Sequence, residues 1–236
     1  FKLVKVVEAL RERITALGGE VRFEHQVTDF VLERTADGRL AMQGLRVRDL
    51  ASGQETTLSA RRVVLALGHS ARDTFEQLHR HGVFLEAKPF SIGVRIEHPQ
   101  SVIDRARWGR HAGHPLLGAA AYKLVHHAHN GRAVYSFCMC PGGTVVAATS
   151  EPERVVTNGM SQYSRAERNA NAGLVVGIGP ADFPQHDAAA WRAAFGDDAG
   201  SRYAAEAAAL GAHGGAHPLA GVVLQRQLES AAYRAG

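Results

Sequence analysis

Five consecutive apolar residues, Val63 to Leu67, end in Gly68 and give way at once to polar residues. A strand that is apolar at every position is typical of a sheet covered on both faces, because a sheet with one wet face gives alternation instead. The run therefore predicts a buried strand in a parallel or mixed sheet. The glycine that ends it lets another backbone or a ligand come closer than a Cβ atom would allow.

The residues after Gly68 have the pattern of a helix start. Ser70 occupies the position of an N-cap, and Asp73 can complete a capping box three residues later. A strand end and a helix N-terminus separated by glycine often receive phosphate groups in α/β proteins, and Arg72 would add positive charge. Two interpretations stay open: a plain strand-to-helix turn, or one edge of a ligand site with His69 beside the ligand.

The remaining pattern divides the chain into two domains, residues 1–87 and 88–236. In the first, apolar residues spaced three and four apart predict a helix over residues 3–17, and turn dipeptides within residues 26–60 predict a three-stranded antiparallel meander. The second domain is expected to be β-rich over 88–183 and helical over 184–236, with helices at 187–195, 201–210 and 221–234. We therefore expect an α/β chain that is α+β overall.

Composition excludes several classes of protein. Hydrophobic residues make up 45% of the chain and charged residues 21%, as in soluble globular proteins. No apolar run has the length of a membrane span, and the scattered charges, with a formal net charge of +4, give little support to nucleic-acid binding. Cys138 and Cys140 are too close in sequence for an ordinary disulfide framework, so a reducing, cytoplasmic location is expected.

Five motifs follow one another in order over most of the chain. They are Ala-Leu-Gly-His-Ser-Ala-Arg-Asp at 66–73, Pro-Phe-Ser-Ile-Gly-Val-Arg-Ile-Glu-His-Pro at 89–99, Tyr-Ser-Phe-Cys-Met-Cys-Pro-Gly-Gly at 135–143, Asn-Gly-Met-Ser at 158–161 and Arg-Asn-Ala-Asn at 168–171. Together they resemble the uncharacterised FAD-dependent dehydrogenases related to the HI0933-like flavoproteins.

The resemblance implies a partial FAD-binding domain with an antiparallel β-meander, plus an inserted, mainly β domain with a helical segment. It implies that FAD would contact Val27, Gly68, His69, Ser70 and Arg72. The G-x-G-x-x-G unit that holds the FAD diphosphate in such families does not occur in this sequence. We therefore interpret the chain as the central fragment of an FAD-dependent oxidoreductase, a fragment that binds FAD weakly or not at all and is inactive by itself.

Residues of the second domain are candidates for shaping a substrate site, whose substrate is unknown. Arg95 is expected to share a strand face with Glu97, either as solvated surface or as an arginine that binds a carboxylate. Cys138 and Cys140 would point to the same face of a strand, as buried structural residues or as a redox or ligand pair. Asn158 opens an Asn-Gly dipeptide, which predicts a turn or a functional loop.

The thirteen histidines do not stand in a recognised ligand spacing, so no metal site is expected. The patterns assign neither a general acid or base nor an oligomeric state. The alternative to an oxidoreductase is a non-catalytic module of the flavoprotein family that binds a partner or RNA.

Overall fold

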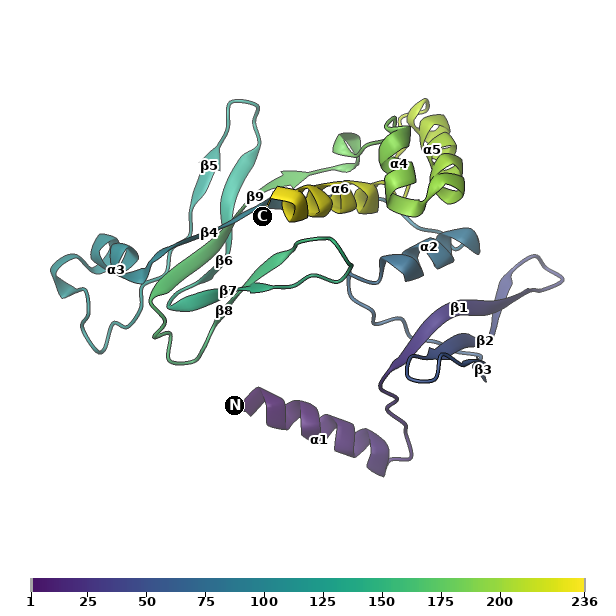
Figure 1. The fold of residues 1–236 in the computed structure, drawn as a ribbon, viewed down its shortest axis with the longest axis horizontal. Helices are drawn as coiled ribbons and strands as arrows, with labels where there is room; N and C mark the ends of the chain where they lie inside the picture. Colours follow the sequence, from purple (N-terminus) through teal and green to yellow (C-terminus); the bar gives the residue numbers. More distant parts are fainter. Residues whose placement is uncertain (1, 236) are drawn as a thin grey trace. The chain divides into compact units, whose positions relative to one another are not determined.

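The first helix forms within one residue of its predicted bounds. In the computed structural model, which describes residues 2–235, α1 spans Lys2–Ala16, and Gly18 follows with a left-handed φ of 85° (Figure 1). Its apolar stripe has the expected helical period, but the stripe is not buried. The exposed fractions run from 47% at Ile14 to 75% at Leu3.

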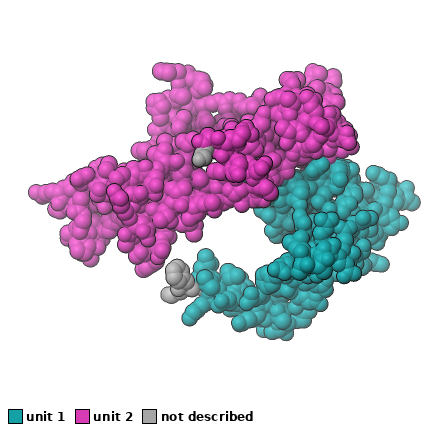
Figure 2. All heavy atoms as spheres, in the orientation of Figure 1, with its two compact units in different colours: residues 1–84 teal, residues 85–236 magenta. Residues whose placement is uncertain are grey.

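The meander that follows is confirmed. Strands β1 (His25–Arg34), β2 (Leu40–Asp49) and β3 (Glu55–Ser59) pair antiparallel in the order β1-β2-β3. Their buried face is centred on Phe30 and Val47, which are 4% and 8% exposed. These elements belong to unit 1, residues 1–84, one of two compact units defined by contacts within the chain (Figure 2).

The predicted buried strand at Val63–Leu67 is wrong. These residues form no strand, and Val64 is 91% exposed, with Leu65 at 46%. A strand needs neighbouring strands to complete its backbone hydrogen bonds, and the sheet of this unit ends at β3. A run of apolar residues favours burial, but it does not provide a neighbouring strand for backbone hydrogen bonds. Helix α2 (Arg72–Arg80) follows the loop, and Gly82 ends it with a φ of 73°.

Unit 2, residues 85–236, is built on a four-stranded antiparallel sheet. Its strands are β4 (Phe90–Pro99), β9 (Asn169–Ile178), β6 (Ala133–Cys140) and β5 (Val125–His127), in that spatial order (Figure 1). Strands β7 (Gly143–Ala147) and β8 (Thr157–Ser161) form a separate hairpin. Helix α3 (Gln100–Trp108) and the short η1 (Gly109–His111) follow β4 directly. The β-rich part of the sequence therefore has an antiparallel architecture.

The alanine-rich region forms the expected helices, α4 (Ala188–Phe195), α5 (Asp197–Gly211) and α6 (Ala220–Ala235), after the short η2 (Pro180–Asp182). Asp187 caps α4, because its Oδ1 accepts a hydrogen bond from Ala190 N at 3.0 Å. Mixed helices and antiparallel sheets confirm the α+β class. Within residues 2–235, the helices all fall short of the length and apolarity that crossing a membrane requires.

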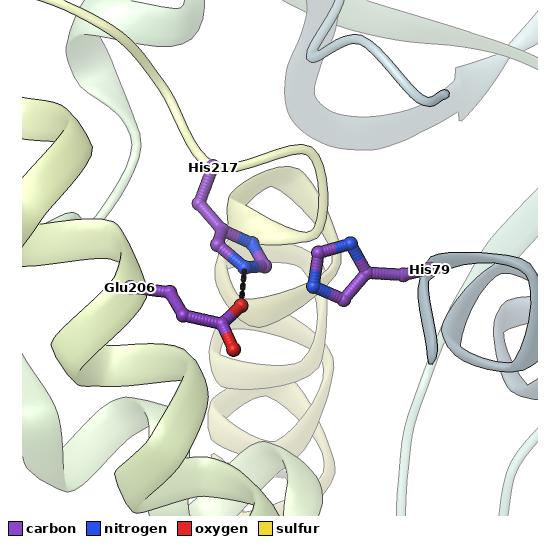
Figure 3. Close-up of side chains that lie close together, drawn as sticks. All are labelled: His79, Glu206 and His217. Carbon is purple, nitrogen blue, oxygen red and sulfur yellow. Dashed lines mark hydrogen bonds and ion pairs between the residues drawn. The ribbon is translucent and has the colours of Figure 1, made fainter. Parts of the chain in front are cut away.

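A histidine lies at the centre of the helical core. His217 is fully buried, with its ring edge-on to Trp191 at a centroid distance of 4.9 Å. Its Nδ1 accepts a hydrogen bond from Leu219 N at 3.1 Å, so the proton of a neutral ring lies on Nε2, 3.1 Å from Glu206 Oε2 (Figure 3). These bonds fix the chain that leads into α6, since a buried polar ring is tolerated only when its nitrogens are satisfied.

Candidate functional site

The turn predicted to border a nucleotide lies on the surface of unit 1. Gly68 has a φ of 69°, and a Cβ atom there would meet nothing within 4 Å. Gly68, His69 and Ser70 are all exposed. Glycine is therefore favoured at position 68 by its backbone conformation, and no close packing partner demands it.

The predicted helix cap is wrong in detail. Ala71, not Ser70, is the N-cap of α2, and it makes no side-chain cap hydrogen bond. The carbonyl of Ser70 accepts a hydrogen bond from Arg72 N at 2.9 Å, which closes a turn before the helix begins. The Asp73 carboxylate accepts instead from Gln26 Nε2 at 3.4 Å. The Ser-x-x-Asp spacing fits a capping box, but it equally fits a turn before a helix that begins one residue later. The spacing alone does not distinguish these two arrangements.

Val27 and the start of α2 lie in the same region of unit 1. Val27 is on β1, paired with Val47 and followed by a register shift. Its neighbour Gln26 bonds Asp73, the residue after Arg72. A second link joins β1 to the chain after α2, because His81 Nε2 lies 2.7 Å from Asp29 Oδ1. Partial burial raises the pKa of Asp29, but the hydrogen bonds from His81 and from the Phe30 backbone outweigh it and hold that pKa below its ordinary value.

Arg95 of unit 2 has no acidic partner among the residues that the structure describes. Its Nη1 donates to Asn171 Oδ1 at 2.7 Å and to the carbonyl of Cys138 at 3.3 Å. Arg95 is half-buried, Asn171 is fully buried, and Arg95 Nε and Asn171 Nδ2 have no hydrogen-bond partner among the described residues. The interpretation of Arg95 as part of a solvated face is therefore wrong. Because β4 pairs with β9, the Arg95 guanidinium lies against the buried amide of Asn171.

The two cysteines do not follow simple strand alternation. The register of β6 with β9 shifts between Phe137 and Cys140, and Cys138 has a left-handed φ of 44°. The side chain of Cys138 is exposed, and that of Cys140 is half-buried with its Sγ 3.4 Å from the carbonyl of Cys138. Both thiols are free. The expectation of two buried structural cysteines on one strand face is wrong for Cys138, because the bulge breaks the alternation.

The Asn158-Gly159 dipeptide lies inside strand β8 and forms no turn. Asn158 Oδ1 accepts a hydrogen bond from Gly159 N at 2.8 Å. A Cβ atom at position 159 would lie 2.5 Å from Arg95 Nη1 and 2.7 Å from Cys140 Sγ, and it would also overlap Asn171 Oδ1. The glycine therefore allows β8 to pack directly against the arginine.

Four of the sequence motifs meet at this point. Arg95, Cys140, Gly159 and Asn171, which we call the arginine cluster, come one each from the motifs at 89–99, 135–143, 158–161 and 168–171. Sequence reasoning did not select Asn171 as a site residue, although it belongs to a quoted motif. Its importance follows from the β4–β9 register, which local patterns do not reveal.

A cavity of about 1130 Å³ lies beside the cluster in unit 2, between α3 and the strands β4 and β6. His98 and Tyr122 lie in its wall with ring centroids 5.6 Å apart, and Cys138 lines it as well. Burial raises the pKa of the Tyr122 phenol, against the opposing effect of the Arg95 charge. The phenol is therefore a hydrogen-bond donor at neutral pH. Sequence reasoning missed both aromatic residues, and only His98 falls within a quoted motif.

Comparisons with known proteins point to one family. Residues 89–209 match the family model described as FAD-dependent protein, C-terminal domain-like. An uncharacterized protein of Clostridium beijerinckii is 40% identical over 232 residues, which cover 98% of this chain and 36% of that relative. The chain thus spans about a third of the relative's length. The matched range holds the whole arginine cluster and every residue that lines the cavity.

Proposed function

Since the chain belongs to the family of FAD-dependent proteins with this C-terminal-domain-like region, we propose that it forms the central part of an FAD-dependent oxidoreductase. Within this proposal the protein is a dehydrogenase related to the HI0933-like flavoproteins. The observation that carries it is the match over residues 89–209, which includes both the arginine cluster and the cavity. Bound FAD would supply the redox chemistry, and the chain would bind and orient the reactants.

The turn of unit 1 fits the edge of a nucleotide site. At Gly68 the backbone is exposed and has space for a close neighbour, and the N-cap of α2, Ala71, makes no side-chain hydrogen bond to the helix. We propose that Gly68, His69, Ser70 and Arg72 border the nucleotide, together with the backbone of Val27. No glycine-rich diphosphate motif occurs within the 236 residues, so the proposal includes weak FAD binding by this chain alone.

The four candidates in unit 2 have two proposed roles. Arg95 would bring positive charge to the substrate region, held in place by Asn171. Cys138, Cys140 and Asn158 would shape the surface around it. A cytoplasmic location belongs to the same proposal, because free thiols persist in a reducing compartment.

Titration of FAD against the purified chain, followed by flavin fluorescence anisotropy, tests the cofactor assignment. We expect a Kd of roughly 100 µM or weaker, a range in which binding is readily lost on purification. Gly68→Val is expected to weaken FAD binding at least tenfold. A branched side chain would strain the left-handed backbone conformation and cover the exposed backbone at this position.

Gly38→Val is the matched control, since Gly38 has a φ of 82° and equally open surroundings but lies in the β1–β2 turn. It should leave FAD affinity unchanged. Equal losses in both variants would contradict the assignment of the Gly68 turn. A full-length preparation of the Clostridium beijerinckii relative with neither bound flavin nor affinity for FAD would contradict the proposed function.

A further inference from the structure

The cavity of unit 2 has an apolar wall with an opening to solvent. Eight of its fourteen lining residues are aliphatic, methionine or phenylalanine side chains. Val102, Leu124 and Phe137 are 47%, 56% and 56% exposed, although they belong to this concave surface. A hollow of this size and composition has the character of a small-molecule site, where apolar contacts supply affinity and a few polar groups fix the orientation.

The charged residues in the wall all carry the same sign. Arg107 and Lys123 line the cavity, and among the described residues that line it there is no aspartate or glutamate. The nearest acidic residue on α3, Asp104, uses Oδ1 to accept from Gln100 Nε2 at 2.7 Å and from Ala120 N at 2.8 Å. Two cations beside an apolar surface, without a carboxylate in the same wall, favour an anion.

Two polar atoms of the wall are buried and lack a hydrogen-bond partner among the described residues. They are His98 Nε2 and Tyr122 Oη. A buried polar atom without a partner costs about 1–3 kcal/mol, so such atoms are uncommon without a functional reason. The centroids of the two rings are 5.6 Å apart, so the two side chains lie in the same part of the wall. Neither atom has appreciable solvent-accessible surface, so an oxygen-bearing ligand would satisfy both only after a small turn of the two rings toward the cavity.

We propose that this cavity binds a small organic carboxylate with an apolar body, whose carboxylate pairs with Lys123 and Arg107 and accepts hydrogen bonds from Tyr122 and His98. Apolar residues predominate in the wall, so the body of the ligand contributes most of the buried surface. The proposal goes beyond the flavin function, because this binding needs no cofactor. If the proposed function also holds, the carboxylate is the substrate class.

Isothermal titration of the purified chain with naphthalene-2-carboxylate, in the absence of FAD, tests the ligand class. From an efficiency of about 0.3 kcal/mol per non-hydrogen atom, we expect a Kd on the order of 1 mM or tighter. The neutral analogue 2-naphthylmethanol should bind at least tenfold more weakly. Equal affinities for the two probes, or no binding of the carboxylate, would overturn the proposal.

Conservative variants locate the contacts. Tyr122→Phe and Lys123→Gln should each weaken carboxylate binding about tenfold, the value of one hydrogen bond to a charged group. Tyr163→Phe and Lys88→Gln are the controls, because both residues are exposed and lie outside the cavity, and both variants should bind normally. Circular dichroism and thermal melting establish that each variant is folded. Folded Tyr122 and Lys123 variants with unchanged affinity would overturn the assignment.

Cys138 provides a reporter that does not depend on mutating the proposed contacts. It lines the cavity and is exposed, and the chain has just one other cysteine, Cys140. In a Cys140→Ala variant, naphthalene-2-carboxylate should slow alkylation of Cys138 by iodoacetamide in proportion to occupancy. An alkylation rate that is unchanged at saturating probe would place the ligand elsewhere and refute this site. None of these measurements uses flavin. A negative result for the carboxylate would therefore leave the outcome of the FAD titration unaffected.

Discussion

Replacing Gly159 with alanine is expected to destabilise unit 2 by about 2 kcal/mol. The added methyl group would lie 2.5 Å from Arg95 Nη1 and 2.7 Å from Cys140 Sγ, whereas real Cβ atoms essentially never approach another atom within 3.0 Å. The guanidinium would have to move, yet its 2.7 Å hydrogen bond ends on Asn171, which is fully buried. Overpacking costs about 1–3 kcal/mol, and loss of a hydrogen bond from a charged donor costs a similar amount.

Gly177→Ala is the matched control for this experiment. Gly177 lies in strand β9, its φ is not left-handed, and a Cβ atom there would meet nothing within 4 Å. Alanine should be neutral or should stabilise by up to about 1 kcal/mol, because it restricts the unfolded chain. The two glycine variants are therefore expected to shift stability in opposite directions.

Urea denaturation followed by tryptophan fluorescence measures both effects, since Trp191 is fully buried in unit 2. In thermal melts a loss of 2 kcal/mol corresponds to a decrease of about 4–8 °C for a domain of this size. An Arg95→Ala background tests the cause, because removing the guanidinium should remove at least half of the Gly159→Ala penalty. If both glycine variants unfolded at the same urea concentration, or if the penalty were the same with and without Arg95, close packing of Gly159 against Arg95 would not be the cause.

Two further predictions concern acidic residues. Asp29→Asn should destabilise unit 1 by about 1 kcal/mol at pH 6, because it weakens the 2.7 Å interaction with His81. The pKa of Asp29 is lowered in the folded state, so its contribution is complete above pH ~4 and is lost as the pH falls through that lowered pKa. The difference between the urea midpoints of the two proteins should therefore shrink as the pH falls below about 4 and vanish below the lowered pKa, and a constant difference would be inconsistent with this assignment. Asp187→Ala should destabilise unit 2 by about 1 kcal/mol, because it removes the hydrogen-bond acceptor that caps α4 at Ala190 N. Asp187→Asn keeps an acceptor and should be nearly neutral. Equal melting temperatures for the two variants would argue against the cap.

Much of the fold was predictable because its signals are local. The helix α1 and the meander β1–β3 depend on residue spacing and on turn glycines such as Gly38 and Gly53, both of which have positive φ. The strand expected at Val63–Leu67 did not form, because hydrophobicity alone does not supply paired backbone partners. Local patterns thus succeed where the stabilising contacts are themselves close in sequence.

The arginine cluster could not be predicted in the same way. Its central hydrogen bond joins Arg95 to Asn171 across 76 positions of sequence, so it depends on the register of β4 with β9. Asn-Gly is the common signal of a tight turn, but here Gly159 serves close packing within a strand. The bulge at Cys138 likewise breaks the alternation from which strand faces are inferred.

The position of β9 in the sheet has a consequence for how the chain folds during synthesis. This strand pairs with both β4 and β6, yet it is the last of the four to leave the ribosome. Until Ile178 has emerged, β4 has no partner and β6 has an open edge, which are templates for wrong pairing. Closing the long β4–β9 loop is also slow, because its contacts are distant in sequence. Chaperones that shield unpaired strands would therefore act on β4 and β6 in the interval before β9 arrives.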